Sequence, residues 1–178
     1  LGTGVLLAAH MLSTCRAEWI DAMLRTMLLS NAAAAAIARG FELTAVTDVT
    51  GFGLAGHLLE MLDASKVNAE LGLAELPVLG GFAALSADGI RSTLDPANRE
   101  TADRIDLATS DFTGQPGYDA LFDPQTSGGM LIGVSADATE AILSNLRDAG
   151  YEQAAVIGIV TESTTTLSRL SVTVTLEK

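Results

Sequence analysis

Asp48 is the residue of this sequence that is best placed to bind a cation. It precedes a short turn, Val49-Thr50-Gly51-Phe52-Gly53, in which glycines let backbone N–H groups approach a ligand and the start of the next helix favours an anion. A carboxylate there repels a bare phosphate group, whereas a divalent cation bridges the two, because Mg²⁺ binds one or two carboxylates together with phosphates and waters. We therefore predict that Asp48 is a metal ligand at the phosphates of a nucleotide. The alternative is that Asp48 only caps the helix.

The same turn also matches the dinucleotide-binding pattern G-x-G-x-x-G. The match runs from Gly51 to Gly56, follows a predicted strand, opens a predicted helix and has Glu70 about 20 residues further on, as that fingerprint requires. The carboxylate of Asp48 argues against this interpretation, because it would repel a pyrophosphate group in the absence of a metal. A dinucleotide-binding oxidoreductase domain is therefore kept only as an alternative.

A second polar turn, residues 125–129, has the sequence Gln-Thr-Ser-Gly-Gly and precedes a predicted strand. It could surround phosphate oxygens, but a tight turn before a buried strand explains the same residues equally well. With two histidines and one cysteine in the chain, no Ser-His-Asp or Cys-His set can be assembled. His57 lies one position from the helical stripe of Leu54, Leu58 and Met61, so we expect it to be a hydrogen-bonded packing group.

Hydrophobic periodicity places these turns between strands and helices. Apolar residues alternate over 41–45, which indicates a strand, and recur at helical spacing over 54–62. The other predicted helices span residues 18–29, 30–39, 77–86, a weak segment ending near 108, and 135–149. The other predicted strands span 67–71, 130–134, 154–160 and 172–176; we expect 154–160 to be buried and 172–176 to lie at an edge. This order predicts an α/β (α+β) sandwich, a mixed β-sheet with helices mainly on one face.

Composition restricts the possible partners. The 178 residues suit one domain, and 48% of them are hydrophobic, which is ample for a core. Acidic residues outnumber basic ones by 22 to 10, for a net charge of −12, which argues against nucleic acid and anionic membranes as partners. No apolar run reaches the roughly 18–20 residues of a membrane helix and no signal peptide is visible, so we expect a cytoplasmic protein. Cys15 is the single cysteine, and we expect it to be inert.

The chain opens with Leu1-Gly2-Thr3-Gly4, without a methionine and within a glycine-rich stretch that we expect to be a turn. We therefore expect the sequence to begin inside a longer polypeptide, whose preceding residues could hold half of an active site.

Two long motifs give this chain a resemblance to a known family. The segment 47–61, Thr-Asp-Val-Thr-Gly-Phe-Gly-Leu-Ala-Gly-His-Leu-Leu-Glu-Met, and the segment 122–129, Phe-Asp-Pro-Gln-Thr-Ser-Gly-Gly, closely resemble the C-terminal half of selenophosphate synthetase, also called selenide, water dikinase. Residues 1–4 and 30–33 also fit that family. Relatives of the aminoimidazole ribonucleotide (AIR) synthetase type carry related Asp-x-x-x-Gly-Gly or Asp-x-x-x-Phe-Gly turns but lack the second motif in this form.

The resemblance implies an activity and a set of site residues. The family forms selenophosphate, AMP and orthophosphate from selenide, ATP and water with Mg²⁺, and its acid at the position of Asp48 helps to hold the metal ions. Its reactive Cys or selenocysteine and its ATP loop belong to an N-terminal domain, through which ATP and selenide would reach this chain, and the full-length enzyme is expected to be a homodimer. No catalytic side chain is assigned here. The predicted nucleotide- or phosphate-facing residues are Thr47, Thr50, Gly51, Asn98, Thr126, Ser127 and Gly128.

The resemblance thus predicts that residues 1–178 are the single C-terminal domain of a two-domain enzyme and that this domain alone is inactive. It also predicts that the Asp48 turn and residues 125–129 lie at the same edge of the sheet. A stand-alone nucleotide-binding or regulatory module without catalysis is the alternative from another class.

Overall fold

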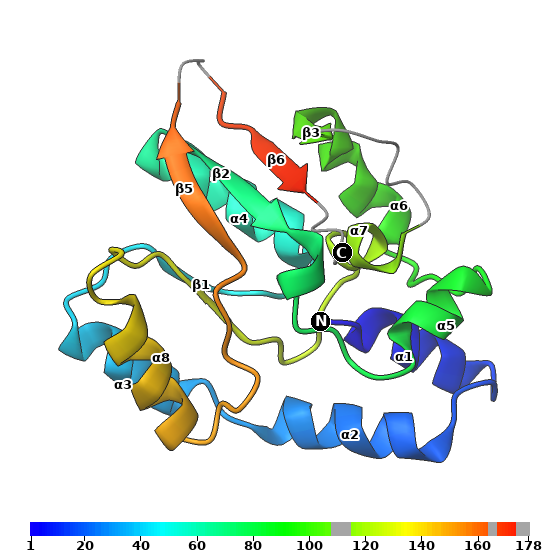
Figure 1. Cartoon of the computed structure of the whole chain (residues 1–178). Helices are drawn as coiled ribbons and strands as arrows, with labels where there is room; N and C mark the ends of the chain where they lie inside the picture. Colours follow the sequence, from blue (N-terminus) through cyan, green and yellow to red (C-terminus); the bar gives the residue numbers. More distant parts are fainter. Residues whose placement is uncertain (108–114, 164–166, 174–178) are drawn as a thin grey trace, which may run out of the picture.

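The larger of two β-sheets has four strands in the order β3-β6-β2-β5 (Figure 1). In this computed structural model, which describes residues 1–107, 115–163 and 167–173, the strands are β2 (Val67–Gly72), β3 (Ile105–Leu107), β5 (Gly158–Glu162) and β6 (Leu170–Thr173). Strand β6 runs parallel to both β2 and β3, whereas β5 runs antiparallel to β2. The sheet is therefore mixed, and the predicted α/β class is confirmed.

Helix α4 (Gly53–Ser65) covers one face of this sheet (Figure 1). Its apolar residues at helical spacing, among them Leu58 and Leu62, are buried against Ala69 and Leu71 of β2. Between them on β2, Glu70 is exposed on the opposite face, so the strand shows the alternation of a half-buried sheet. This packing gives the main core and sets where α4 begins.

A separate two-stranded ribbon carries the candidate site. Strand β1 (Val46–Asp48) pairs antiparallel with β4 (Met130–Ile132), with Asp48 opposite Met130. Helices α3 (Ala32–Gly40) and α8 (Thr139–Asp148) pack together beside the ribbon and bury Ile142. The ribbon is thereby fixed between this helix pair and α4.

A third cluster of buried residues joins three helices at the N-terminal side of the molecule. Helices α1 (Thr3–Met11), α2 (Ala17–Leu28) and α5 (Phe82–Ala87) bury Leu6, Met23 and Phe82. The remaining helical segments are η1 (Leu73–Glu75), α6 (Asp95–Asn98), η2 (Arg99–Arg104) and α7 (Pro116–Ala120). Within the described ranges, no single helix has the length and apolar composition to cross a bilayer. Helices α2 and α3 have that length and composition only when they are taken together, and a bend of 47° lies between them.

Several predicted elements need correction. The first strand lies at 46–48 rather than 41–45, because the chain at Phe41 is still closing the end of α3. The glycine-rich opening is not a turn: α1 already begins at Thr3. The helix predicted from residue 77 starts only at Phe82, after Gly81 adopts a left-handed conformation. The weak helix that was expected to reach residue 108 ends at Arg104, and β3 begins at the next residue, Ile105.

The two C-terminal strands exchange their predicted places. The last strand was expected at an edge, but β6 lies between β3 and β2, and its Leu170 and Val172 are fully buried. Strand β5 was expected to be buried, but it is the edge strand, and Ile159 and Val160 are each 60% exposed. The predicted extension of the last strand over 174–176 lies outside the described residues.

Candidate functional site

The two glycine-rich turns singled out by the sequence lie side by side. We call residues 48–53 the Asp48 turn and residues 123–129 the Gln125 turn. The Val49 amide donates to the Gly129 carbonyl at 2.9 Å, and the Gln125 amide donates to the Thr50 carbonyl at 2.9 Å. The β1–β4 pairing continues directly into these bonds. Both turns therefore lie at the same end of the β1–β4 ribbon, in agreement with the prediction that they share one edge of a sheet.

Two glycines are required for close packing around the turns, Gly128 between the two turns and Gly53 against the residues just before the Gln125 turn. A Cβ atom on Gly128 would lie 2.0 Å from the Val49 carbonyl oxygen. Gly53 has a φ of +69°, and a Cβ atom there would lie 2.8 Å from the Leu121 carbonyl oxygen. Gly51 and Gly129 differ, because a Cβ atom would meet only a Leu94 methyl group at 3.9 Å in the first case and nothing within 4 Å in the second. Their lack of a side chain leaves open space at the surface of both turns.

Asp48 is exposed at the end of β1. Among the described residues, no hydrogen bond or ion pair engages its carboxylate, and α4 has Phe52 at its N-cap without any side-chain capping bond. The structure therefore does not support the alternative that Asp48 caps this helix. A carboxylate without a partner in the described part of its own chain is available to a ligand.

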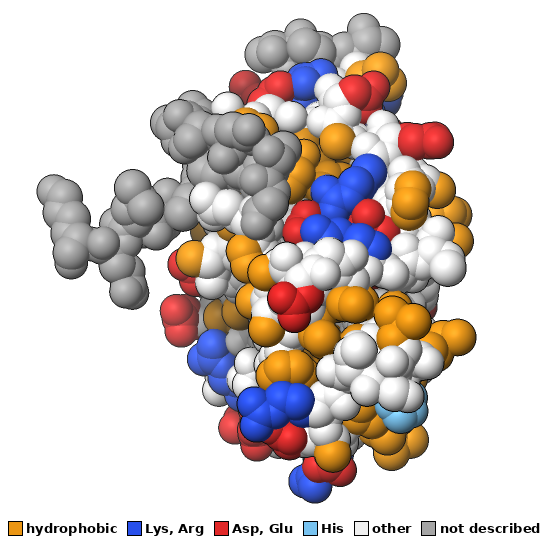
Figure 2. Space-filling view, turned by 90° about the vertical axis from the view of Figure 1, so that its right-hand side faces the viewer, with side chains coloured by type: hydrophobic (Ala, Val, Ile, Leu, Met, Phe, Trp, Pro, Cys, Tyr) orange, Lys and Arg blue, Asp and Glu red, His pale blue; other side chains and the backbone are white. Residues whose placement is uncertain are grey.

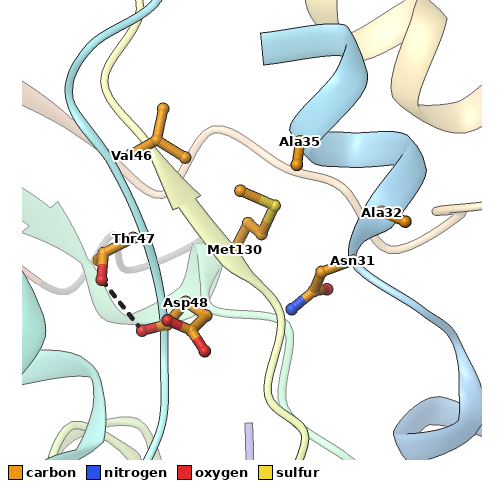
Figure 3. Close-up of a pocket in the computed structure, with 7 residues that line it drawn as sticks. All are labelled: Asn31, Ala32, Ala35, Val46, Thr47, Asp48 and Met130. Atoms are coloured by element: carbon orange, nitrogen blue, oxygen red, sulfur yellow. Dashed lines mark hydrogen bonds between the residues drawn. The ribbon is translucent and has the colours of Figure 1, made fainter. Parts of the chain in front are cut away.

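A shallow pocket of about 440 Å³ lies next to Asp48, between the ribbon and α3 (Figure 3). In the close-up, the apolar side chains of Val46, Ala35 and Met130 line one part of the pocket, and the polar ends of Asn31 and Asp48 line the other. The remaining lining residues are Ala32 and Thr47. The Thr47 hydroxyl also contacts the Asp48 carbonyl at 3.3 Å.

The donor set suits one corner of a hard-cation site. In the described part of the chain, no group of three or more His, Cys, Asp or Glu side chains is placed to hold a metal ion. Mg²⁺ does not need such a cage, because one or two protein carboxylates suffice when substrate phosphates and waters supply the other ligands. Asp48 therefore fits as a single protein ligand of Mg²⁺, and the other ligands must come from elsewhere.

Asn98 does not face a ligand, although it is one of the predicted site residues. Its side chain is 7% exposed, and its amide nitrogen donates to the Gly51 and Phe122 carbonyl oxygens, both at 2.9 Å. Both amide hydrogens are thus used within the protein. Asn98 connects the Asp48 turn to the residue just before the Gln125 turn and acts as a structural brace.

The outer residues of the Gln125 turn remain accessible. Thr126 and Ser127 are exposed, Gly128 is half-buried, and Ser127 has an unusual φ of +50°. The Thr126 amide donates to the Thr3 hydroxyl at 2.8 Å. Thr126 and Ser127 can therefore present hydroxyl groups to a ligand, whereas the Thr126 amide is already paired.

Two further side chains hold this turn, and sequence reasoning did not assign them this role. Gln125 is buried, and its side-chain oxygen accepts from the amides of Gly2 at 3.0 Å and Thr3 at 3.3 Å. The Asn31 amide donates to the Gly128 carbonyl at 2.9 Å. The Gln125 and Asn31 contacts span 123 and 97 positions of sequence, so no local pattern could reveal them.

Asp123 is a buried acid at the base of the Gln125 turn. Its side chain is 1% exposed, and its Oδ2 accepts from the Gly4 amide and from the Gln125 side-chain amide, both at 3.0 Å. Its Oδ1 has no partner among the described residues. Burial raises the pKa of Asp123 from 3.8 to about 6, although these hydrogen bonds oppose the shift.

His57 is the hydrogen-bonded packing group that the sequence predicts. It is 8% exposed on α4, and its Nε2 lies 3.0 Å from the Thr50 hydroxyl. Its Nδ1 lies 3.5 Å from a Glu60 carboxylate oxygen.

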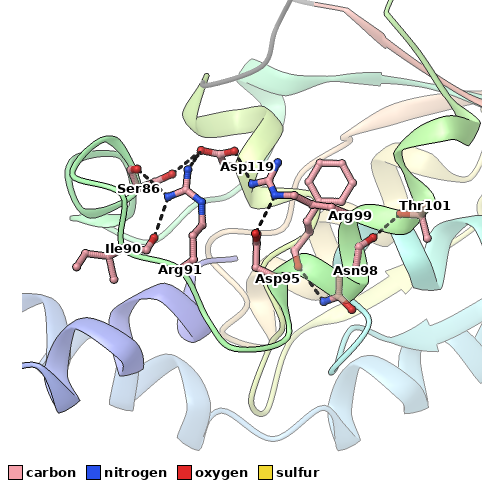
Figure 4. Close-up of polar contacts among 9 residues, drawn as sticks. Ser86, Ile90, Arg91, Asp95, Asn98, Arg99, Thr101 and Asp119 are labelled. Atoms are coloured by element: carbon pink, nitrogen blue, oxygen red, sulfur yellow. Dashed lines mark hydrogen bonds and ion pairs between the residues drawn. The ribbon is translucent and has the colours of Figure 1, made fainter.

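Behind the turns, a salt-bridge cluster connects α7 to α6, to η2 and to the segment that follows α5 (Figure 4). The buried Asp119 carboxylate accepts from Arg91 at 2.8 Å on one side and from Arg99 at 2.6 Å on the other. Arg99 also binds Asp95 and lies over the ring of Phe122, 4.8 Å from its centroid. Arg91 and Arg99 are therefore committed to acids of their own chain, and the cluster supports the turns from behind.

On the face shown in Figure 2, basic side chains occur in separate groups with acidic ones beside them.

Comparison with known proteins identifies similar chains. The family model described as AIR synthase related protein, C-terminal domain, matches residues 8–168. The selenide, water dikinase of Geobacter metallireducens is 38% identical over 160 residues, which are 90% of this chain and 46% of that protein. Those of Burkholderia pseudomallei and Clostridioides difficile are 37% and 32% identical over 158 and 167 residues, which cover 89% and 90% of this chain and 44% and 46% of those proteins. The chain thus spans about half the length of the curated relatives it matches.

Proposed function

The chain belongs to the family of AIR synthase related proteins, whose C-terminal domain it matches over residues 8–168, and from this membership we propose that it is the C-terminal part of a selenophosphate synthetase. Such an enzyme converts selenide, ATP and water to selenophosphate, AMP and phosphate. The name of the relatives, selenide, water dikinase, contains both selenide and water. In this proposal, residues 1–178 are one domain of a longer, homodimeric, cytoplasmic enzyme.

Asp48 supplies one ligand for Mg²⁺ at the ATP phosphates in this proposal. The observation that carries it is the free, exposed carboxylate of Asp48 at the junction of the two turns, in a chain 38% identical to a selenide, water dikinase. When bound, Mg²⁺ would neutralise charge on the phosphates during transfer. Thr47, Thr126 and Ser127 would contribute hydroxyl groups around these phosphates, and Gly51 and Gly128 would keep the turns close to them.

The dinucleotide-binding alternative finds less support. In a Rossmann fold the strand before the glycine turn belongs to a parallel sheet, whereas β1 pairs only with antiparallel β4 among the described strands. A Cβ atom on Gly53 would meet a backbone carbonyl oxygen at 2.8 Å, and one on Gly56 would lie 2.7 Å from the Cβ of Phe52. Internal packing therefore explains both of these glycines.

The decisive experiment is Asp48→Asn in a fusion of this chain to the half of the Geobacter metallireducens enzyme that it does not match. We expect the unsubstituted fusion to release AMP from ATP only when selenide is present. Asp48→Asn should lower that rate by about 100-fold or more, since a hard-cation site loses its charged ligand.

The unfolding free energy supplies the control for this substitution. Because Asp48 is exposed and unpaired in the described structure, the change in stability should stay within about 0.5 kcal/mol. A folded fusion without selenide-dependent AMP release would contradict the assignment and favour a non-catalytic nucleotide-binding or regulatory module. An active Asp48→Asn variant would remove Asp48 from the metal site.

A further inference from the structure

The side chains of Glu60, His57 and Thr50 contact one another in succession, and Thr50 belongs to the Asp48 turn. The Thr50 hydroxyl lies 3.0 Å from Nε2 of His57, and Nδ1 of His57 lies 3.5 Å from a Glu60 carboxylate oxygen. His57 is 8% exposed, and the Phe52 ring covers it with a centroid separation of 5.5 Å. His57 and Glu60 both belong to α4, so the helix holds the imidazole in one orientation relative to the turn.

The chemistry of the imidazole decides which atom carries each hydrogen. A neutral imidazole has one nitrogen that donates and one that accepts, whereas an ionised carboxylate can only accept. The nitrogen that faces Glu60, Nδ1, is therefore the donor, and Nε2 must be the acceptor. The Thr50 hydroxyl has to donate its hydrogen to Nε2.

This arrangement fixes what Thr50 can offer to a ligand. A hydroxyl group has a single hydrogen and two acceptor lone pairs. With the hydrogen committed to His57, the oxygen can only accept from any other partner. An unprotonated phosphate oxygen needs a donor, whereas a metal ion or its bound water needs an acceptor.

We propose that His57 and Glu60 are positioning residues that hold the Thr50 hydroxyl as a hydrogen-bond acceptor, so that the Asp48 turn binds a hydrated divalent cation rather than a bare phosphate group. Thr50 lies two positions after Asp48, and both then present acceptor oxygens at the same turn. The inference rests on the proposed function for the presence of the cation, and it replaces direct phosphate contact as the role of Thr50.

The hydrogen positions can be measured without metal or substrate. In the ¹⁵N-histidine-labelled chain, nitrogen NMR distinguishes protonated from unprotonated ring nitrogens. The chain has two histidines, His10 and His57, so the signals that disappear in the variant His57→Gln are those of His57. At a pH of about 8, above the range in which free imidazole protonates, we expect hydrogen on Nδ1 and none on Nε2 of His57. Hydrogen on Nε2 instead would overturn the proposal.

Matched variants of Glu60 and Thr50 test the link to the cation, with Mn²⁺ alone as the probe. Glu60→Gln and Glu60→Ala remove the same charge, but only the amide retains an oxygen that accepts from Nδ1. We expect Glu60→Ala to shift hydrogen toward Nε2 and to bind Mn²⁺ roughly tenfold more weakly than Glu60→Gln, as is typical when a partner of a metal-site residue is lost. Thr50→Val should weaken Mn²⁺ binding in the same way, and Thr50→Ser should not.

The two arms separate the failure of this inference from that of the proposed function. Equal Mn²⁺ affinity and an equal hydrogen distribution in the two Glu60 variants would reduce His57 and Glu60 to packing groups. In a uniformly ¹⁵N-labelled chain, absence of any Mn²⁺ effect on the backbone amide signals of Asp48 and Thr50 would overturn the cation role of the turn. Neither result depends on selenide-dependent AMP release, which tests the proposed function independently.

Discussion

Asp123 shows how burial changes the behaviour of a single carboxyl group. Its Oδ2 accepts two hydrogen bonds that favour the ionised form, yet its Oδ1 is buried without a partner among the described residues. Burial is the larger effect and raises its pKa from 3.8 to about 6. The protonated form is thus favoured more strongly in the folded chain than in the unfolded one.

This shift predicts a loss of stability as pH rises. Because the folded pKa of Asp123 is the higher one, its contribution is fully present below about pH 3.8 and is lost as pH rises through about 6. The rise in the pKa of Asp123 from 3.8 to about 6 corresponds to about 3 kcal/mol of unfolding free energy, most of which is lost between pH 4 and pH 7. Asp123→Asn cannot titrate, so the difference in unfolding free energy should move in favour of the variant by about 2 kcal/mol over that range.

Urea denaturation of both proteins at several pH values measures this difference. Arg104 and Arg169 lower the pKa values of Asp63 and Asp106, so these two acids increase the unfolding free energy as pH rises. This opposite contribution is the same in variant and wild type and cancels in the difference between them. Parallel pH profiles for the two proteins would show that Asp123 has the same pKa in the folded and unfolded chain.

Local sequence patterns single out candidate residues, but they do not give the contacts that those residues make. Asp48 was recognisable because an acid between a strand and a glycine-rich helix start is a local pattern. Asn98 was predicted to face the nucleotide or its phosphates, but its side-chain amide donates to carbonyl oxygens 47 and 24 positions away. A polar side chain that faces a ligand and one that braces two turns have the same local sequence signal.

At the scale of elements, the contact between the two turns depends on one glycine. Gly128→Ala would place a methyl group 2.0 Å from the backbone carbonyl oxygen of Val49, and neither segment can move without breaking the bonds that join the turns. We expect Gly128→Ala to destabilise the chain by about 1–3 kcal/mol, the usual cost of overpacking.

Gly129→Ala is the matched control, because a Cβ atom there has no neighbour within 4 Å and no positive φ is involved. We expect it to change the unfolding free energy by no more than about 0.5 kcal/mol. Thermal melts of the two variants make the comparison. Equal melting temperatures would mean that the Gln125 turn is not pressed against Val49.

The same scale explains which elements could be predicted. Helices such as α2 and α4 could be predicted because their apolar residues recur at helical spacing within the helix itself. Period-2 alternation identifies the faces of a strand but not its neighbours, so β5 and β6 were assigned to the wrong places in the sheet. Strand β3 has only three residues, Ile105–Leu107, which is too short to show a period.

At the scale of the whole molecule, the described residues offer few groups for phosphoryl transfer. Phosphoryl transfer relies on several cations and donors arranged around the phosphates. Asp48 is a single carboxylate, the nearby basic cluster of Arg91 and Arg99 is occupied by Asp119, and the described residues provide no group of three metal ligands. The chain also spans only about half the length of its relatives. These observations agree with a domain that completes a site rather than one that contains it.

The 178-residue chain alone should therefore fold but release no AMP from ATP and selenide. A cooperative thermal melt would show that the core around α4 and the four-stranded sheet forms without further residues. AMP should stay at the level of a reaction without protein, because one free carboxylate and two glycine-rich turns cannot position ATP and neutralise its phosphates together. The active fusion with the Geobacter metallireducens half provides the positive control under identical Mg²⁺, ATP and selenide. Selenide-dependent AMP release by the pure chain, lost in Asp48→Asn, would instead place a complete active site within these residues.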